Sequence, residues 1–148
     1  RGLSGDDIRA LHPGGAIGRR MSKVSDVMHS GDRLPLVRLD TPMTEVVTTI
    51  TRKRLGMTGV LDKDGALVGV ITDGDLRRHM TDVANARAED VMSLSPKVIE
   101  QSASVEDALE MMRAHRITVL FVVTAAGKRA PVGAVQIYDI AASPPWGQ

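Results

Sequence analysis

The sequence contains no cysteine and very few aromatic residues, and each absence excludes a class of protein. Without cysteine among its 148 residues, the chain forms no disulfide bond and offers no thiolate for catalysis or zinc binding. One Phe, one Tyr and one Trp are too few for the stacking platforms of nucleic-acid-binding proteins. No apolar run approaches the ~18 residues of a membrane-spanning helix, and no signal peptide is visible. We therefore expect no nucleic-acid partner, no membrane association and a cytoplasmic location.

Charge and composition indicate a small globular protein. The formal net charge is +1 and 43% of the residues are hydrophobic, with acidic and basic residues interspersed. The length fits one domain or two small lobes that share a core. No cluster of His, Asp and Glu has the spacing of metal ligands, so we predict no metal site. Because the chain begins with Arg1 rather than Met, we expect it to be part of a longer protein.

One turn, in the segment GVITDGDLRR of residues 69–78, carries the first functional signal. The apolar, β-branched residues before Thr72 predict a buried strand. Thr72 and Asp75 have the spacing of a capping box, which predicts that a helix begins here. Arg77 and Arg78 then follow near the start of the helix, where the helix dipole disfavours cations unless an anion lies nearby. The turn is therefore a helix cap, a ligand site, or both.

The chain also contains an internal repeat. The tripeptide Asp-Val-Met at residues 26–28 recurs at residues 90–92. Each copy continues with apolar residues at helical spacing, beginning at Met43 in the first copy and at Val105 in the second. We predict Thr41 as the N-cap of the first of these helices and Pro42 as its first residue.

Each copy is predicted to run strand, helix, strand, strand, helix. The closing helices are expected near Asp75–Met80 and Asp139–Ala142. Neither copy is long enough to bury much core alone, so the copies should pair and leave a cleft around a pseudo-twofold axis. The expected organisation is a first copy at 23–84 and a second at 85–142, preceded by a segment at 1–22 and followed by a tail at 143–148.

The repeated tripeptide, the paired helices and the match of GVITDGDL with GAVQIYDI resemble a tandem CBS pair, or Bateman module, over residues 23–142. The resemblance implies a mixed α/β (α+β) fold of two β-α-β-β-α motifs packed about a pseudo-twofold axis. It also implies that Asp75 binds the two hydroxyls of a ribose while Thr72 assists near the sugar or phosphate. A carboxylate has enough acceptor sites for both hydroxyls of a cis-diol.

The resemblance implies that residues of both copies form the ligand site. The expected ligand-binding residues are Met57, Thr58, Thr72, Asp73, Gly74, Asp75, Arg77, Arg78, His115, Arg116 and Thr118. The basic pairs at 53–54 and 115–116 either reach phosphates or are solvated helix ends. The second copy has Gln136 in place of Thr72, so a second site, with Asp139, Lys53 and Arg54, is expected to be weak or empty.

Residues 1–20, RGLSGDDIRALHPGGAIGRR, resemble the end of the sugar isomerase (SIS) domain of D-arabinose 5-phosphate isomerases, which precedes a CBS pair. These enzymes convert ribulose 5-phosphate to arabinose 5-phosphate, on the route to the lipopolysaccharide sugar Kdo, and the resemblance implies no catalytic cofactor. His12 would be an active-site residue for proton transfer or ring opening, although without the resemblance a His before Pro-Gly-Gly is more typical of a loop residue at a turn. The remaining active-site groups are missing, so this chain alone is expected to be inactive. His29 and His79 are expected at the surface.

Three functions follow from these patterns. The first is a regulatory module for an attached SIS domain that senses CMP-Kdo or an adenine nucleotide (AMP, ADP or ATP). The second is a purely structural module that assembles a homodimer or tetramer. The third, catalysis within this chain, requires His12 to act without its partners and is disfavoured. The intact Thr72 and Asp75 pair favours the first.

Overall fold

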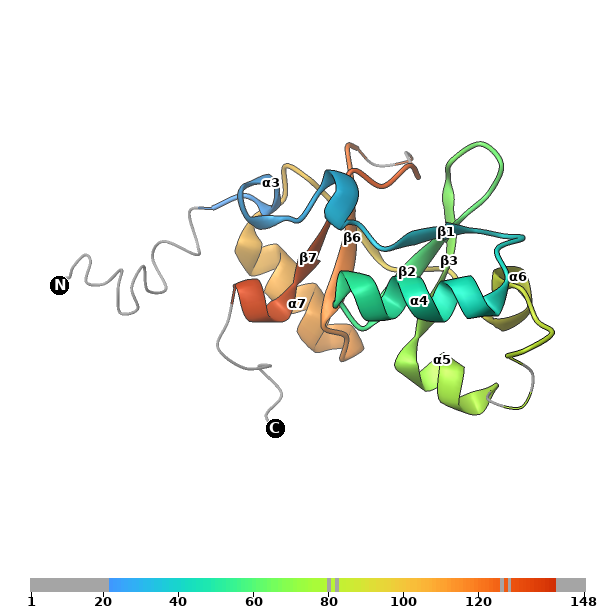
Figure 1. The fold of residues 1–148 in the computed structure, drawn as a ribbon. Helices are drawn as coiled ribbons and strands as arrows, with labels where there is room; N and C mark the ends of the chain where they lie inside the picture. Colours follow the sequence, from blue (N-terminus) through green and yellow to red (C-terminus); the bar gives the residue numbers. More distant parts are fainter. Residues whose placement is uncertain (1–21, 80, 82, 126, 128, 141–148) are drawn as a thin grey trace, which may run out of the picture.

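The computed structural model describes residues 22–79, 81, 83–125, 127 and 129–140, which form two small sheets flanked by helices (Figure 1). The elements of the first copy are β1 (Leu36–Arg38), α4 (Met43–Lys53), β2 (Met57–Leu61), β3 (Leu67–Thr72) and α5 (Asp73–Arg78). Those of the second copy are β5 (Val98–Glu100), α7 (Val105–His115), β6 (Val119–Val123), β7 (Gly133–Gln136) and the 3-10 helix η3 (Ile137–Asp139). Shorter elements precede each copy, namely α3 (Val24–Val27) and η1 (Gly31–Arg33), and α6 (Ala88–Val91) and β4 (Ser93–Leu94).

Both sheets have the same topology, which confirms the predicted fold class and the strand-helix-strand-strand order. One sheet has the order β1-β2-β3-β4 and the other β5-β6-β7. In each, the first strand pairs in parallel with the second, and the second pairs antiparallel with the third. A parallel pair needs a crossover, and α4 and α7 supply it.

The two long helices form where the apolar spacing predicted them. Each begins a few residues after the first strand of its copy and buries one apolar face, with Val46 and Ile50 on α4 and Ala108 and Met112 on α7. The predicted start of α4 was wrong by one residue. Pro42 is the N-cap, and the Thr41 hydroxyl instead accepts a hydrogen bond from the Arg38 N–H.

The end of the second copy differs from the prediction. Among the described residues the closing element is the 3-10 turn η3, which begins two residues before the predicted start at Asp139, and residues 141 and 142 of the predicted helix lie outside the described residues. In the first copy the Thr72 hydroxyl caps α5, whereas Gln136, at the N-cap of η3, makes no capping hydrogen bond with its side chain.

The short helices before each copy pack against the other copy. Val24 of α3 lies in a core cluster with Ile99 and Leu120 of the second copy, and the His29 N–H donates to the Ala134 carbonyl of β7. Likewise α6, which precedes the second copy, buries Ala88 in the core of the first. Each core is therefore completed by a segment that lies outside its own strand-helix-strand-strand unit.

A third core cluster joins the two sheets. It contains Met57 and Leu67 from the first sheet and Val119 and Phe121 from the second. Phe121 and Gly59 are the third residues of β6 and β2, so they occupy equivalent places. A methyl group on Gly59 would lie 3.0 Å from the Phe121 ring and 2.7 Å from the Leu67 side chain. The ring of one copy thus fills the space that the glycine of the other leaves open.

Candidate functional site

A cleft of about 450 Å³ lies between the two copies. We call it the first cleft. It is lined by Leu55, Gly56, Met57, Val70, Thr72, Asp73, Gly74, Ser93, Leu94, Ser95, Pro96, Lys97, Arg116, Ile117, Thr118, Val119 and Phe121. The residues come from the start of β2, the end of β3, the segment after α6 and the end of α7, so both copies form the wall.

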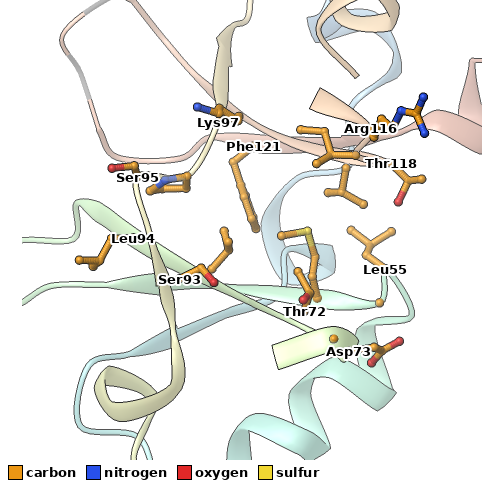
Figure 2. A pocket seen from close by; sticks show the side chains of 17 residues that line it. Leu55, Thr72, Asp73, Ser93, Leu94, Ser95, Lys97, Arg116, Thr118 and Phe121 are labelled. Atoms are coloured by element: carbon orange, nitrogen blue, oxygen red, sulfur yellow. The ribbon is translucent and has the colours of Figure 1, made fainter. Parts of the chain in front are cut away.

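The first cleft has an apolar centre and polar edges of different charge. Figure 2 shows the Phe121 side chain between Thr72 and Asp73 on one side and Lys97 and Arg116 on the other. Asp73 is exposed at the first turn of α5, and Lys97 and Arg116 are exposed at the opposite rim. The arrangement offers an apolar surface to a flat ring, hydrogen-bond acceptors on one edge and cations on the other.

Backbone conformation also marks the clefts. Within the described ranges, Arg54, Ser95 and Arg116 are the non-glycine residues with positive φ, at 66°, 61° and 55°. Ser95 and Arg116 line the first cleft, while Arg54 lines a second cleft described below. Left-handed conformations are unfavourable for residues with a side chain and are concentrated at functional sites. Arg54 and Arg116 hold equivalent places, since each is the C-cap of a long helix.

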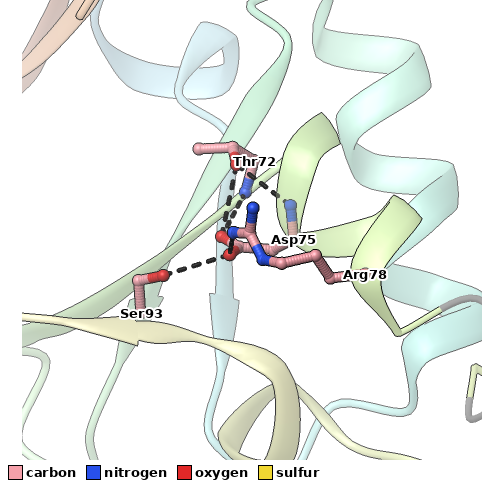
Figure 3. Close-up of polar contacts among 4 residues, drawn as sticks. All are labelled: Thr72, Asp75, Arg78 and Ser93. Atoms are coloured by element: carbon pink, nitrogen blue, oxygen red, sulfur yellow. Dashed lines mark hydrogen bonds and ion pairs between the residues drawn. The ribbon is translucent and has the colours of Figure 1, made fainter.

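Asp75 lies behind the wall of the first cleft and is bound by four donors (Figure 3). Its Oδ2 accepts hydrogen bonds from the Thr72 N–H at 3.0 Å and the Thr72 hydroxyl at 3.2 Å. Its Oδ1 accepts from the Ser93 hydroxyl at 3.1 Å and from the Arg78 guanidinium. The capping box predicted from the sequence is confirmed, with the Asp75 N–H donating to the Thr72 hydroxyl.

These donors stabilise the charged form of the carboxylate. Burial of Asp75, which is 3% exposed, would raise its pKa. The hydrogen bonds from the Thr72 N–H, the Arg78 guanidinium and the Ser93 hydroxyl, together with the positive charge of Arg78, outweigh burial and hold the pKa below its usual value. The ionised side chain of Asp75 thus links the turn that begins α5 to β4 through hydrogen bonds.

The structure brings some of the expected ligand-binding residues together at the first cleft and leaves others away from it. Those that line it are Met57, Thr72, Asp73, Gly74, Arg116 and Thr118. Those that do not are Thr58, Asp75, Arg77, Arg78 and His115. Thr58 is completely buried and its hydroxyl donates to the Gly59 carbonyl, while Arg77 and His115 are exposed on their helices.

A second cleft, of about 420 Å³, occupies the pseudo-equivalent position. Lys53 and Arg54 line it, as does Gln136, but Asp139 does not. The Asp139 Oδ2 lies 2.6 Å from the His29 Nε2. The expectation that His29 is a plain surface residue was wrong, because this contact and the packing against β7 leave its side chain only 16% exposed.

The sequence analysis missed the segment 93–97, which supplies Ser93, Ser95 and Lys97 to the first cleft. The repeated Asp-Val-Met was the available signal. Ser93 directly follows Met92, as His29 follows Met28, and these residues contact Asp75 and Asp139 respectively. Aligning the copies on the repeat would have paired the two contacts.

No group of three or more His, Asp or Glu side chains is placed to hold a metal ion in the described part of the chain. No helix among the described residues is long and apolar enough to cross a membrane. His12, with the rest of the segment at 1–21, and the tail beyond residue 142 lie outside the described residues.

Comparison with known proteins assigns the family. The CBS domain model matches residues 24–82 and 88–144. The arabinose 5-phosphate isomerase KdsD of Pseudomonas aeruginosa is 43% identical over 144 residues, which is 95% of this chain and 44% of that protein. KdsD of Escherichia coli K12 is 36% identical over 126 residues, covering 82% of this chain and 38% of that protein. The chain thus spans less than half the length of these curated relatives, and they confirm the predicted resemblance to arabinose 5-phosphate isomerases.

Solved structures share the architecture. The CBS-pair protein CBSX2 from Arabidopsis thaliana is 25% identical, with a TM-score of 0.67 over 80% of this chain and 91% of that one. A structure of CBSX2 in complex with AMP matches equally well, over 92% of its chain. With two matched copies, two equivalent sheets and a cleft between them, this chain belongs to the CBS domain family as a tandem CBS pair.

Proposed function

We propose that this chain is the ligand-sensing module of an arabinose 5-phosphate isomerase, and that the first cleft binds a nucleotide or nucleotide sugar. The relatives named above support the parent enzyme. The observation that carries the binding proposal is the first cleft itself, which combines an apolar centre with a polar edge from one copy and a cationic edge from the other. A nucleotide has the same three parts: a flat base, a hydroxyl-bearing sugar and an anion.

Each part of the ligand has a place in this proposal. The base packs against Met57, Val70 and Phe121, which are apolar and line the first cleft. The sugar hydroxyls meet Thr72 and Asp73. Asp75 reaches a ribose only if Ser93 or Arg78 releases it, because its oxygens already accept hydrogen bonds from four donors.

The anion meets the rim of the second copy. Arg116 and Lys97 are exposed there, and neither forms an ion pair with another described residue. A ligand held at both edges favours one relative orientation of the two copies. It biases an attached SIS domain by its differential affinity for that orientation. We propose this regulation for a cytoplasmic enzyme that assembles as a homodimer or tetramer.

The ligand class follows from chemistry shared by two candidates. AMP, ADP and ATP are supported by the AMP complex of the similar CBSX2. CMP-Kdo is supported by pathway logic, since it is the activated product downstream of arabinose 5-phosphate. Both carry a base, a ribose and at least one anionic group.

The test is calorimetry with AMP, ADP, ATP and CMP-Kdo on the wild type and on a matched pair of variants. Arg116→Asn and Arg54→Asn remove one cation from the first and second clefts respectively, at two left-handed helix C-caps where Asn is tolerated. We expect Arg116→Asn to weaken nucleotide binding by about 1.5–3 kcal/mol, the worth of a charge-assisted hydrogen bond, and Arg54→Asn to leave it unchanged.

Absence of binding by all four compounds contradicts the sensing function. The purely structural alternative then gains support if sedimentation shows a stable dimer or tetramer. Equal loss in the two variants would show that the anion is not held at the first cleft. A thermal shift supports the same measurement, since a ligand at 100 times its Kd stabilises a protein by about 2.7 kcal/mol.

We also predict that the chain alone does not isomerise ribulose 5-phosphate. His12 is the one active-site residue that the resemblance assigns to it, and catalysis needs several groups held in register. Conversion by the purified chain that disappears in His12→Ala would contradict this prediction.

A further inference from the structure

The second cleft has the same construction as the first but different chemistry. It is lined by His29, Asp32, Arg33, Arg52, Lys53, Arg54, Leu55 and Gln136. As in the first cleft, the residues come from the segment after a short helix, the end of a long helix and the end of a hairpin. The two clefts can therefore be compared position by position. This comparison does not depend on which ligand the first cleft binds.

The second cleft has fewer apolar side chains to pack against a base than the first cleft has. Leu55 is the apolar residue of its lining, whereas Met57, Val70 and Phe121 line the first cleft. The difference follows from the packing at the pseudo-twofold axis. Gly59 stands in the first copy where the second copy has Phe121, so the second cleft has no equivalent of the Phe121 ring.

The second cleft does not repeat the acceptors of the first: Ile137 stands where the first cleft presents Asp73, and the carboxylate in its lining, Asp32, comes from η1 instead. Asp139 is the equivalent of Asp75, but it is absent from the lining and its Oδ2 is 2.6 Å from the His29 Nε2. Gln136 stands where the first cleft presents the Thr72 hydroxyl. The acceptors that face the sugar in the first cleft are therefore not reproduced at the same positions here.

Four of the side chains that line the second cleft are cationic. Arg33 comes from η1, and Arg52, Lys53 and Arg54 come from the end of α4, against one carboxylate, Asp32. Within the described ranges, none of the three arginines forms an ion pair. The Lys53 ammonium donates to the backbone carbonyl of Asp32 and so ties η1 to the end of α4.

Cations at a helix C-terminus are favourable by themselves and often merely solvated. Arg33 is different, because it reaches the same cavity from a separate element, and the Lys53 contact holds that element in place. Four cations against the one carboxylate of Asp32 give the lining an excess of positive charge, which favours a bound anion. Arginine and lysine are the side chains that bind phosphate groups most strongly.

We propose that the second cleft binds a compact polyanion without a base, that is, a small phosphate-bearing molecule, through Arg33, Arg52, Lys53 and Arg54. The ligand class is set by the charge of the lining and by the absence of an equivalent of the Phe121 ring. The proposal gives the two clefts different ligands, in place of one site and a weakened copy of it.

The probe is inorganic pyrophosphate, titrated by calorimetry into the chain at low salt and again at raised salt. We expect pyrophosphate to bind the wild type, and raised salt to weaken that binding because the contacts are electrostatic. The double variant Arg52→Gln/Arg54→Asn should lower the affinity at least tenfold, while Arg116→Asn, at the equivalent position of the first cleft, should leave it unchanged. Arg33→Gln, an exposed change on η1, provides an independent variant if the double variant does not fold.

Three results overturn the proposal: no pyrophosphate binding, equal binding by the wild type and the second-cleft variants, or a loss caused by Arg116→Asn instead. Titration of AMP into the same variants separates this proposal from the proposed function. AMP binding should be weakened by Arg116→Asn and not by the second-cleft variants. If AMP does not bind, the pyrophosphate experiment still tests the second cleft. If pyrophosphate does not bind, the AMP experiment still tests the first cleft.

Discussion

Replacing Asp75 tests whether this carboxylate holds the fold or holds the ligand. Each hydrogen bond to a charged group contributes about 1.5–3 kcal/mol, and loss of an N-cap interaction costs about 0.5–2 kcal/mol. The Arg78 side chain is 65% exposed, so its contribution is at most about 1 kcal/mol. Because such contributions overlap, we expect Asp75→Ala to lower the free energy of unfolding by about 2–4 kcal/mol in total.

The assay is urea unfolding followed by circular dichroism, with Asp73→Ala as the matched control. Asp73 is two residues away on the same turn, exposed, and lines the first cleft. We expect Asp73→Ala to weaken nucleotide binding while costing less than about 1 kcal/mol of stability, the worth of an acidic residue in the first turn of a helix. The reasoning is refuted if Asp75→Ala unfolds at the wild-type urea concentration and loses nucleotide binding, because Asp75 would then be a ligand residue.

The same side chain predicts a pH dependence. The pKa of Asp75 is lower in the folded state than its usual value, so the unfolded chain takes up a proton at a higher pH than the folded chain does. The stability that Asp75 contributes is therefore complete above the unfolded pKa, near 4, and is lost as pH falls through the folded pKa. The difference in stability between the wild type and Asp75→Asn should be constant from about pH 5 to 7 and shrink below about pH 4. A difference that persists at acid pH would show that the charge is not its source.

The remaining predictions concern the packing of the two copies. Gly59→Ala should destabilise the chain by about 1–3 kcal/mol in urea unfolding, because the added methyl meets Phe121 and Leu67 at 3.0 and 2.7 Å. Gly74→Ala, where the added methyl has its nearest neighbours at 3.5 Å and the backbone is helical, is the control for loss of glycine, and an equal destabilisation would contradict the overpacking. His29→Ser should cost roughly 1 kcal/mol through the lost contact with Asp139. Asp139→Asn should then add little to His29→Ser, and fully additive losses in the double variant would show that the two side chains do not interact.

The local features of the fold were predictable from the sequence. The capping box of Thr72 and Asp75, the long helices α4 and α7 and the hairpin strands depend on residues close together in the chain. The surroundings of Asp75 were not predictable in the same way. Its fourth donor, Ser93, comes from β4, and no local spacing reveals that β4 adds to the first sheet beside β3.

The second cleft, too, could be predicted only in part from the sequence. The sequence placed Lys53 and Arg54 at a helix end, but Arg33 reaches the cavity from η1 through tertiary packing. The sequence also left His29 at the surface, since its partner Asp139 is distant along the chain. The presence of Gln136 where the first copy has Thr72 is visible at one aligned position, and the expectation of a weak or empty second nucleotide site rests on it.

The exchange of short helices between the copies has a consequence for synthesis of the chain. As the polypeptide leaves the ribosome, the first copy lacks Ala88 and Val91 until α6 has emerged, so its core stays incomplete after its last strand is made. Val24 of α3 remains without its core partners for longer, because these partners extend from Ile99 to Val135 and Ile137. Contacts so distant in sequence form slowly. The nascent chain thus exposes the apolar face of α3 to water and to chaperones until nearly the whole pair has been translated.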